Sequence, residues 1–161
     1  MYRKLVAGLG ALALVVAGCG DEEKESTSSG DSLTKTEYIA KADEICAAAK
    51  KVTDRANKQI DALPANARVQ DGVPAIASAL EASRNAARRL QALPEPGEDK
   101  ATLDAYLANI DKTNAAGARL EAAARAGDLA KVEQFGKSDN LRAKSKRLAT
   151  QYGFKRCSRG K

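Results

Sequence analysis

Histidine is absent from this chain of 161 residues. Its absence removes the commonest general base and the usual metal ligand, and it makes a Ser-His-Asp or Cys-His catalytic system impossible. It also excludes the Glu-x-x-His pairs that bind iron in carboxylate-bridged helical bundles. The sequence further lacks a glycine-rich phosphate-binding loop between a strand and a helix. We therefore predict that the protein is not an enzyme and that it holds no metal ion or cofactor.

Large apolar side chains are scarce. Aromatic residues make up 4% of the chain, with no tryptophan and a single methionine, although 43% of all residues are hydrophobic. Much of that fraction is alanine, so the core must be thin and the helices must approach closely. Alanine has the highest helix propensity, and strand-favouring clusters of Val, Ile, Thr and Tyr are missing. The composition predicts an all-α fold, and the length suits one domain.

The N-terminal apolar run is too short to span a bilayer. It covers residues 5–17 after a short basic start, which is the pattern of a signal peptide. The run ends in Val16-Ala17-Gly18-Cys19, and small residues before a cysteine at this place resemble the lipobox of bacterial lipoproteins. The resemblance implies cleavage of residues 1–18 and attachment of a diacylglyceryl group, carrying palmitate-type chains, to Cys19. The alternative is an ordinary secretory signal followed by an incidental cysteine.

The segment after Cys19 has no core-forming side chains. Residues 20–32 are acidic and serine-rich, which predicts that residues 19–32 are a lipidated cysteine followed by a disordered linker. A flexible linker of this length reaches roughly 20 Å, and two acyl chains are enough for stable anchoring. We therefore expect residues 33–161 to form a helical domain that is lipid-anchored at the extracytoplasmic face of the cell membrane. Nucleic acid is not an expected partner there.

With Cys19 assigned to lipid, Cys46 and Cys157 remain. Outside the cytoplasm an even pair of cysteines is most economically a disulfide. The bond would close a loop of about 112 residues, which the chain-entropy model values at roughly 4–5 kcal/mol as an upper figure. The alternative is a pair of free thiols with a redox role, but the sequence has no Cys-x-x-Cys spacing.

Apolar residues recur at helical spacing along four segments. The first segment starts at a capping box formed by Thr34 and Glu37, and the third and fourth are separated by Gly127-Asp128. The last ends at Gly153, the expected left-handed stop. The predicted helices cover about residues 34–63, 74–93, 99–126 and 129–152, the last with a bend or break between residues 136 and 140.

These segments predict an up-down-up-down four-helix bundle, preceded by a signal helix and the disordered linker. In that topology the first helix starts and the last helix ends at the same end of the bundle. Tyr38, Cys46, Tyr152, Phe154 and Cys157 then gather there, in agreement with the disulfide. The alternative of three helices and a disordered tail leaves the two cysteines far apart.

Two sets of side chains are candidates for a ligand site. Tyr38, Tyr106 and Tyr152 are predicted to line a pocket between helices or to offer a phenolate to haem, although aromatic residues on an apolar stripe are more often core. Asp104 and Asp111 share a helix face and form a possible cation site, but carboxylates that face water are more often solubilising residues. The sequence leaves both alternatives open at this point.

The C-terminal stretch is the one segment with a one-sided charge. The whole chain carries +6, and loss of Arg3 and Lys4 with the signal leaves 25 basic and 21 acidic residues, a net charge of +4. Such a stretch is more often a solvated helix face and a frayed tail; the alternative is that the basic C-terminus contacts anionic lipid or a wall polymer. Its basic residues are Lys144, Lys146, Arg147, Lys155, Arg156, Arg159 and Lys161.

Four parts of the sequence carry a resemblance: the lipobox, the acidic linker, the segment from Leu33 to Cys46 and the terminal segment from Tyr152 to Cys157. Together they resemble small exported helical lipoproteins of actinobacteria. The resemblance covers both ends of the domain and implies an extracytoplasmic helical domain with paired cysteines, but no biochemical activity. Our preferred hypothesis is a non-enzymatic envelope protein that binds a protein or glycan partner or has a structural role. The alternative is a small-ligand carrier, for lipid or haem, with a pocket between helices.

Overall fold

The computed structural model describes residues 32–137 and 140–158. The predicted signal peptide, the lipidated Cys19 and residues 20–31 of the linker lie outside the described residues. Among the described helices, none is both long enough and apolar enough to cross a membrane.

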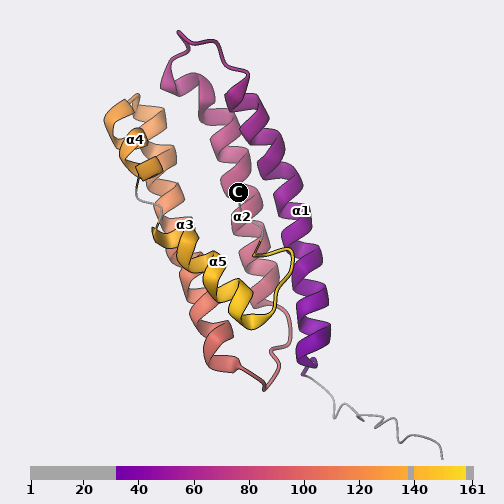
Figure 1. Ribbon diagram of the computed structural model, residues 1–161. Helices are drawn as coiled ribbons and strands as arrows, with labels where there is room; N and C mark the ends of the chain where they lie inside the picture. Colours follow the sequence, from indigo (N-terminus) through magenta and orange to yellow (C-terminus); the bar gives the residue numbers. More distant parts are fainter. Residues whose placement is uncertain (1–31, 138–139, 159–161) are drawn as a thin grey trace, which may run out of the picture.

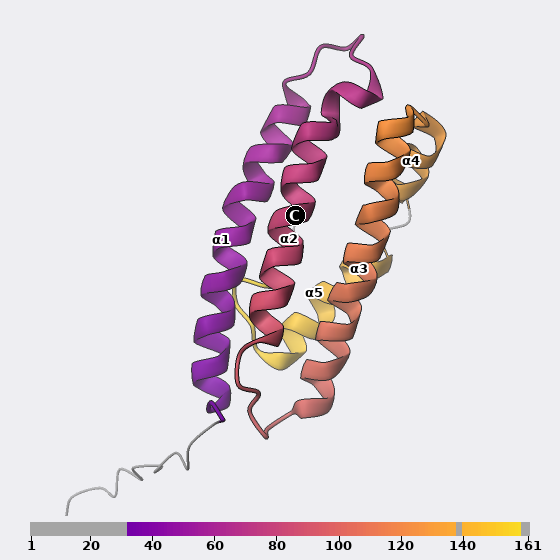
Figure 2. The ribbon, with the colours of Figure 1, turned by 180° about the vertical axis from the view of Figure 1, so that it is seen from behind.

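The described residues form an all-helical bundle without strands, as the composition predicts. Helices α1, α2 and α3 lie side by side, and their chain direction alternates from one to the next (Figures 1 and 2). α2 packs against both α1 and α3, whereas α4 and α5 pack against α3. The elements are α1 (Lys35–Asp61), the short 3-10 helix η1 (Val69–Gly72), α2 (Val73–Gln91), α3 (Lys100–Ala126), α4 (Leu129–Lys137) and α5 (Asn140–Tyr152).

The ends of the helices follow local sequence chemistry. The Thr34 side chain accepts a hydrogen bond from the Glu37 backbone N–H, and the Glu37 carboxylate accepts one from the Thr34 N–H, which confirms the predicted capping box. Gly127 adopts the left-handed conformation (φ 74°) at the end of α3. Gly153 does the same (φ 106°) after α5, and the Phe154 N–H donates back to the Ala149 carbonyl.

The bend or break predicted between residues 136 and 140 is confirmed as a break in the fourth helical segment. α4 ends at Lys137 and α5 begins at Asn140, so the irregularity predicted between residues 136 and 140 separates two helices. Gly136 and Asn140 are both poor interior helix residues, which weakens helix propagation at this point. α5 lies along α3 on the way back toward the end of the bundle where α1 begins (Figure 1).

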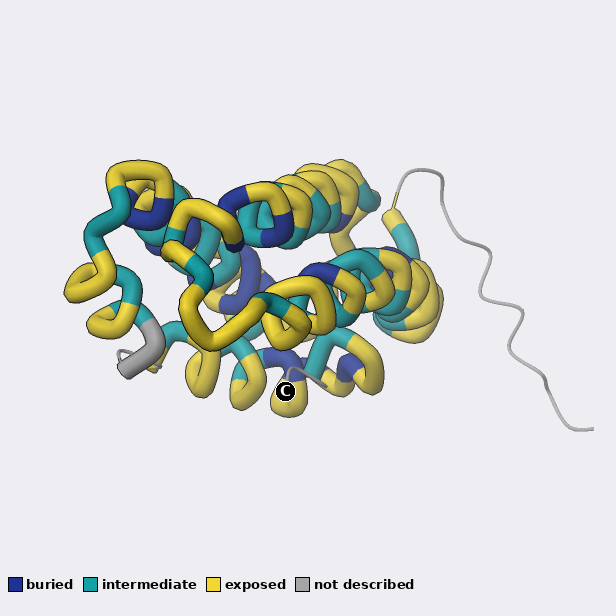
Figure 3. Tube along the Cα trace, turned by 90° about the horizontal axis from the view of Figure 1, so that it is seen from above, coloured by how far each residue is buried: buried dark blue, intermediate teal, exposed yellow. Residues whose placement is uncertain are grey.

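The core changes character along the bundle. Near the start of α1 it is built from large side chains, whereas in the other half alanine and glycine separate the helices and allow close approach. A Cβ atom on Gly117 of α3 would lie 2.3 Å from Cδ2 of Leu80 on α2. Figure 3 shows the buried positions on the inward sides of the helices. Leu129, the first residue of α4, is 54% exposed.

Candidate functional site

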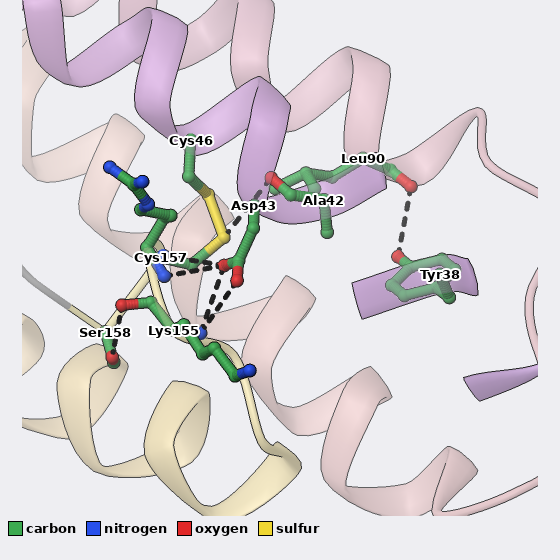
Figure 4. The surroundings of a disulfide bond; sticks show 9 residues. Tyr38, Ala42, Asp43, Cys46, Leu90, Lys155, Cys157 and Ser158 are labelled. Atoms are coloured by element: carbon green, nitrogen blue, oxygen red, sulfur yellow. Dashed lines mark hydrogen bonds between the residues drawn. A yellow bond between two sulfur atoms is a disulfide. The ribbon is translucent and has the colours of Figure 1, made fainter. Parts of the chain in front are cut away.

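The two terminal parts of the domain are joined covalently. Cys46 on α1 and Cys157 after α5 form a disulfide with their Cα atoms 5.1 Å apart (Figure 4). The predicted pairing is confirmed, and with it the expected gathering of Tyr38, Tyr152 and Phe154 near one end of the bundle.

A second link between α1 and the C-terminal segment, in addition to the disulfide, was not predicted; we call each of these two links a clamp. The Asp43 carboxylate accepts hydrogen bonds from three successive backbone N–H groups, those of Lys155 at 2.9 Å, Arg156 at 2.7 Å and Cys157 at 3.2 Å. The only sequence signal was that Asp43 precedes Cys46 by three residues, which places both side chains on the same side of a helix. α1 therefore holds the C-terminal segment by one covalent bond and one carboxylate.

Replacing Asp43 with alanine is expected to lower the free energy of unfolding by about 2 kcal/mol, because three backbone donors lose a charged acceptor at a partly exposed site. Asp43→Asn should cost roughly half as much, since an amide oxygen at the Oδ1 position still accepts these bonds without the charge. Urea denaturation measures both changes. Glu44→Ala, on the exposed side of α1, is the control and should change stability by less than about 0.5 kcal/mol; an equal loss in both alanine variants would contradict the clamp.

Of the two alternatives for the three tyrosines, a pocket lining or the core, the structure shows the core. Tyr38, Tyr106 and Tyr152 are only 0%, 4% and 1% exposed. Phe154 packs among them, with its ring centroid 5.1 Å from that of Tyr106 and 4.8 Å from that of Tyr152. Phe154, which folds back after Gly153, thus occupies the space that a ligand would need. We call these four residues the aromatic cluster.

Burial also favours the protonated form of the three tyrosines in the aromatic cluster. Loss of solvation raises the pKa of Tyr38 and of Tyr106 well above the ordinary tyrosine range, and it raises the pKa of Tyr152 in the same direction. A phenolate ligand for haem would require the charged form that this environment disfavours. The haem interpretation of the three tyrosines therefore loses its physical basis.

Two hydroxyl groups of the aromatic cluster are expected to respond differently to removal. The Tyr38 hydroxyl donates to the Leu90 carbonyl at 3.2 Å, whereas the buried Tyr152 hydroxyl has no hydrogen-bond partner among the described residues. Tyr38→Phe should therefore lower the free energy of unfolding by roughly 0.5–1 kcal/mol. Tyr152→Phe should leave it unchanged or raise it, because an unsatisfied buried hydroxyl is removed while the ring stays. Thermal melts of the two variants make a matched comparison, and a larger loss for Tyr152→Phe would contradict it.

The larger of two hollows on the surface lies between α3, α4 and α5, away from the aromatic cluster. We call it the α3–α4–α5 groove; it has a volume of about 320 Å³, and a smaller hollow of about 160 Å³ lies between α1 and α2. Neither is lined by a tyrosine. The α3–α4–α5 groove is lined by Thr113, Ala116, Arg119, Leu120, Ala123, Lys131, Gln134, Phe135, Leu141 and Arg142.

The α3–α4–α5 groove combines apolar and cationic side chains. Leu120, Phe135 and Leu141 come from three different helices and are all partly exposed. Arg119, Lys131 and Arg142 are exposed at the same hollow, and no lining residue is acidic. Lys131 pairs with Asp128 at 2.6 Å, which raises the pKa of its ammonium and lowers that of the Asp128 carboxyl. The groove therefore presents positive charge beside an apolar floor.

The carboxylates considered for a cation site serve other contacts. Asp104 pairs with Lys100 at 3.2 Å, and the Asp111 carboxylate accepts a hydrogen bond from Gln91 at 3.1 Å. The part of the chain that the structure describes contains no cluster of three or more residues suited to hold a metal ion.

No protein family, curated protein or solved structure matches this chain. The titratable groups in the α3–α4–α5 groove are cations, and the tyrosines with raised pKa values are enclosed in the core. This arrangement is suited to binding an anion rather than to moving a proton.

Proposed function

We propose that the protein is a lipid-anchored binding module without catalytic activity on the extracytoplasmic face of the cell membrane. Residues 1–18 are removed as a signal peptide, Cys19 carries the acyl chains, and residues 20–32 are the linker to the 33–161 domain. That domain is an up-down-up-down bundle in which α4 and α5 together serve as the fourth limb. Its helical surface binds an anionic component of the cell envelope.

The observation that carries this proposal is the one-sided charge of the C-terminal segment. From residue 140 to residue 161 the sequence contains no acidic residue. The cations of the described part of this segment are all exposed, and one of them, Arg142, lines the α3–α4–α5 groove. Such a surface attracts anionic lipid head groups or anionic wall polymers. The exposed cations are Arg142, Lys144, Lys146, Arg147, Lys155 and Arg156.

The anchor is tested by Cys19→Ala. The expected result is an unprocessed precursor that lacks any acyl mass, because acylation of the thiol precedes cleavage in the lipobox pathway that the sequence resembles. Intact mass spectrometry of the purified chain measures both features. Cys46→Ala is the control, since it should still yield the acylated mature form. Normal processing of Cys19→Ala would reject the lipid anchor.

The binding role is tested by crosslinking in intact cells followed by purification of the full chain. We expect a reproducible envelope component, and we expect Lys146→Glu with Arg147→Glu to reduce its recovery several-fold by reversing charge on α5. Lys51→Glu with Lys58→Glu is the matched control because both lysines are exposed cations of α1, outside the basic C-terminal segment. Recovery that is equal in both double variants would reject the basic surface as the contact.

A second function, that of a small-ligand carrier, is favoured by the α3–α4–α5 groove. Its volume of about 320 Å³ lies at the low end of the roughly 300–1,000 Å³ typical of small-molecule sites. In this alternative the ligand is held between α3, α4 and α5, and the three tyrosines act only as core residues.

A further inference from the structure

The α3–α4–α5 groove lies far from the end of the bundle that the linker joins. Lys35 at the start of α1 forms an ion pair with Asp99, just before α3, so both helices begin at that end. The groove is lined by α3 residues 113–123, which at 1.5 Å per residue lie roughly 20–35 Å farther along the helix. A ligand in the groove therefore sits well away from the attachment point of the domain.

The lining of the groove separates into an apolar part and a charged part. Leu120, Phe135 and Leu141 supply apolar side chains from all three helices. The polar neutral residues are few: Thr113 already donates its hydroxyl to the Asn109 carbonyl, and Gln134 has a partner of its own. A groove with so few available donors and acceptors is poorly suited to recognise a sugar or a nucleotide, which presents many polar groups.

The charged part is complementary to a single anionic group. Arg119 has no ion pair among the described residues, and its exposed guanidinium is joined at the groove by Lys131 and Arg142. A guanidinium binds a carboxylate through two parallel hydrogen bonds. Lys131 is paired with Asp128, so Arg119 is the groove cation that finds no counter-charge among the described residues.

We propose that the α3–α4–α5 groove binds a free long-chain fatty acid, with the acyl chain on Leu120, Phe135 and Leu141 and the carboxylate at Arg119. This inference rests on the proposed binding function and names a ligand class for it. The half-open hollow of about 320 Å³ suits one chain. The cations select the ionised acid over a neutral lipid of the same length, because a neutral head group gains nothing from their field.

The test is photocrosslinking of the full chain in membranes from the cells that express it. The probe is hexadecanoate with a diazirine near the end of its chain, and the labelled peptides are mapped by mass spectrometry. We expect label on peptides that contain the groove residues of α3, α4 and α5. Hexadecanoate should compete at least tenfold better than hexadecanol, and octanoate should compete at least tenfold more weakly, because each buried methylene is worth roughly a fourfold change in affinity.

Variants with matched controls distinguish labelling that results from binding in the groove from labelling that results only from proximity to the membrane. Arg119→Glu reverses the charge at the proposed carboxylate position, and Thr113→Trp fills the hollow; each should reduce labelling at least fivefold. Lys112→Glu and Ala118→Trp place the same side chains on exposed positions of α3 outside the groove, and both should keep wild-type labelling. A thermal melt of every variant establishes that it is folded, and if Thr113→Trp is not, Arg119→Glu decides alone.

Label on other peptides, or label that survives Arg119→Glu, would overturn the fatty-acid proposal, as would the absence of label. The crosslinking in intact cells described for the envelope partner is carried out on the same cells. Absence of groove label on the wild-type chain together with recovery of that partner rejects the fatty acid alone, whereas absence of both on the wild-type chain rejects the binding function.

Discussion

Replacing Cys46 and Cys157 together with serine is expected to lower the free energy of unfolding by about 4 kcal/mol. The disulfide spans a sequence separation of 111 residues, and a cross-link over so long a loop restricts the unfolded chain strongly. Domains of this size have total stabilities of about 5–15 kcal/mol, so the bond accounts for a large share. At about 3 °C per kcal/mol, the melting temperature should fall by roughly 10–15 °C.

Calorimetry of the oxidised protein, the reduced protein and the double serine variant measures this effect. Reduced wild type and the variant should melt at the same temperature, because both lack the same constraint. Asp43→Ala in the double serine background separates the two clamps: a carboxylate that binds the segment by itself still contributes there, since its three hydrogen bonds do not depend on sulfur. A variant that melts with the oxidised wild type would show that the cysteines are not bonded.

Raising the pH above 10 is expected to unfold the domain cooperatively. The ordinary tyrosine pKa is 10.0, and burial raises the pKa of Tyr38 and Tyr106 well above it in the folded protein. Below pH 10 both states hold the phenolic protons, so stability does not depend on these groups. Above pH 10 the unfolded chain ionises while the folded chain stays protonated, and stability falls by about 1.4 kcal/mol per pH unit for each tyrosine. Tyr38 and Tyr106 together give about 3 kcal/mol per unit.

Absorbance at the tyrosinate band follows ionisation, and circular dichroism follows helix content in the same titration. We expect the two signals to change together, because all three tyrosines of the described residues are buried and ionise only when the bundle opens. Tyr106→Phe should make the loss of stability with pH shallower by about 1.4 kcal/mol per unit. Tyrosinate that forms near pH 10 with full helix content would contradict the enclosed aromatic cluster.

The helix ends could be predicted because they depend on residues close together in the sequence. The cysteine pairing could be predicted because the sequence offered a single pair. A capping box needs residues three positions apart, as Thr34 and Glu37 are, and a left-handed stop needs a glycine such as Gly127 or Gly153. The periodic apolar positions of α1, α2 and α3 likewise follow from the helical repeat itself. The disulfide followed from there being a single pair of cysteines outside the lipobox.

Tertiary structure decided what no local pattern encodes. Phe154 fills the space among the three tyrosines, and Asp43 meets backbone groups more than 100 positions away because α5 carries the C-terminal segment back to α1. The break between α4 and α5 leaves Leu120, Phe135 and Leu141 lining a groove instead of a closed core. Spacing determines which side of a helix a residue occupies. Only packing between helices determines whether that side meets another side chain or remains open to a ligand.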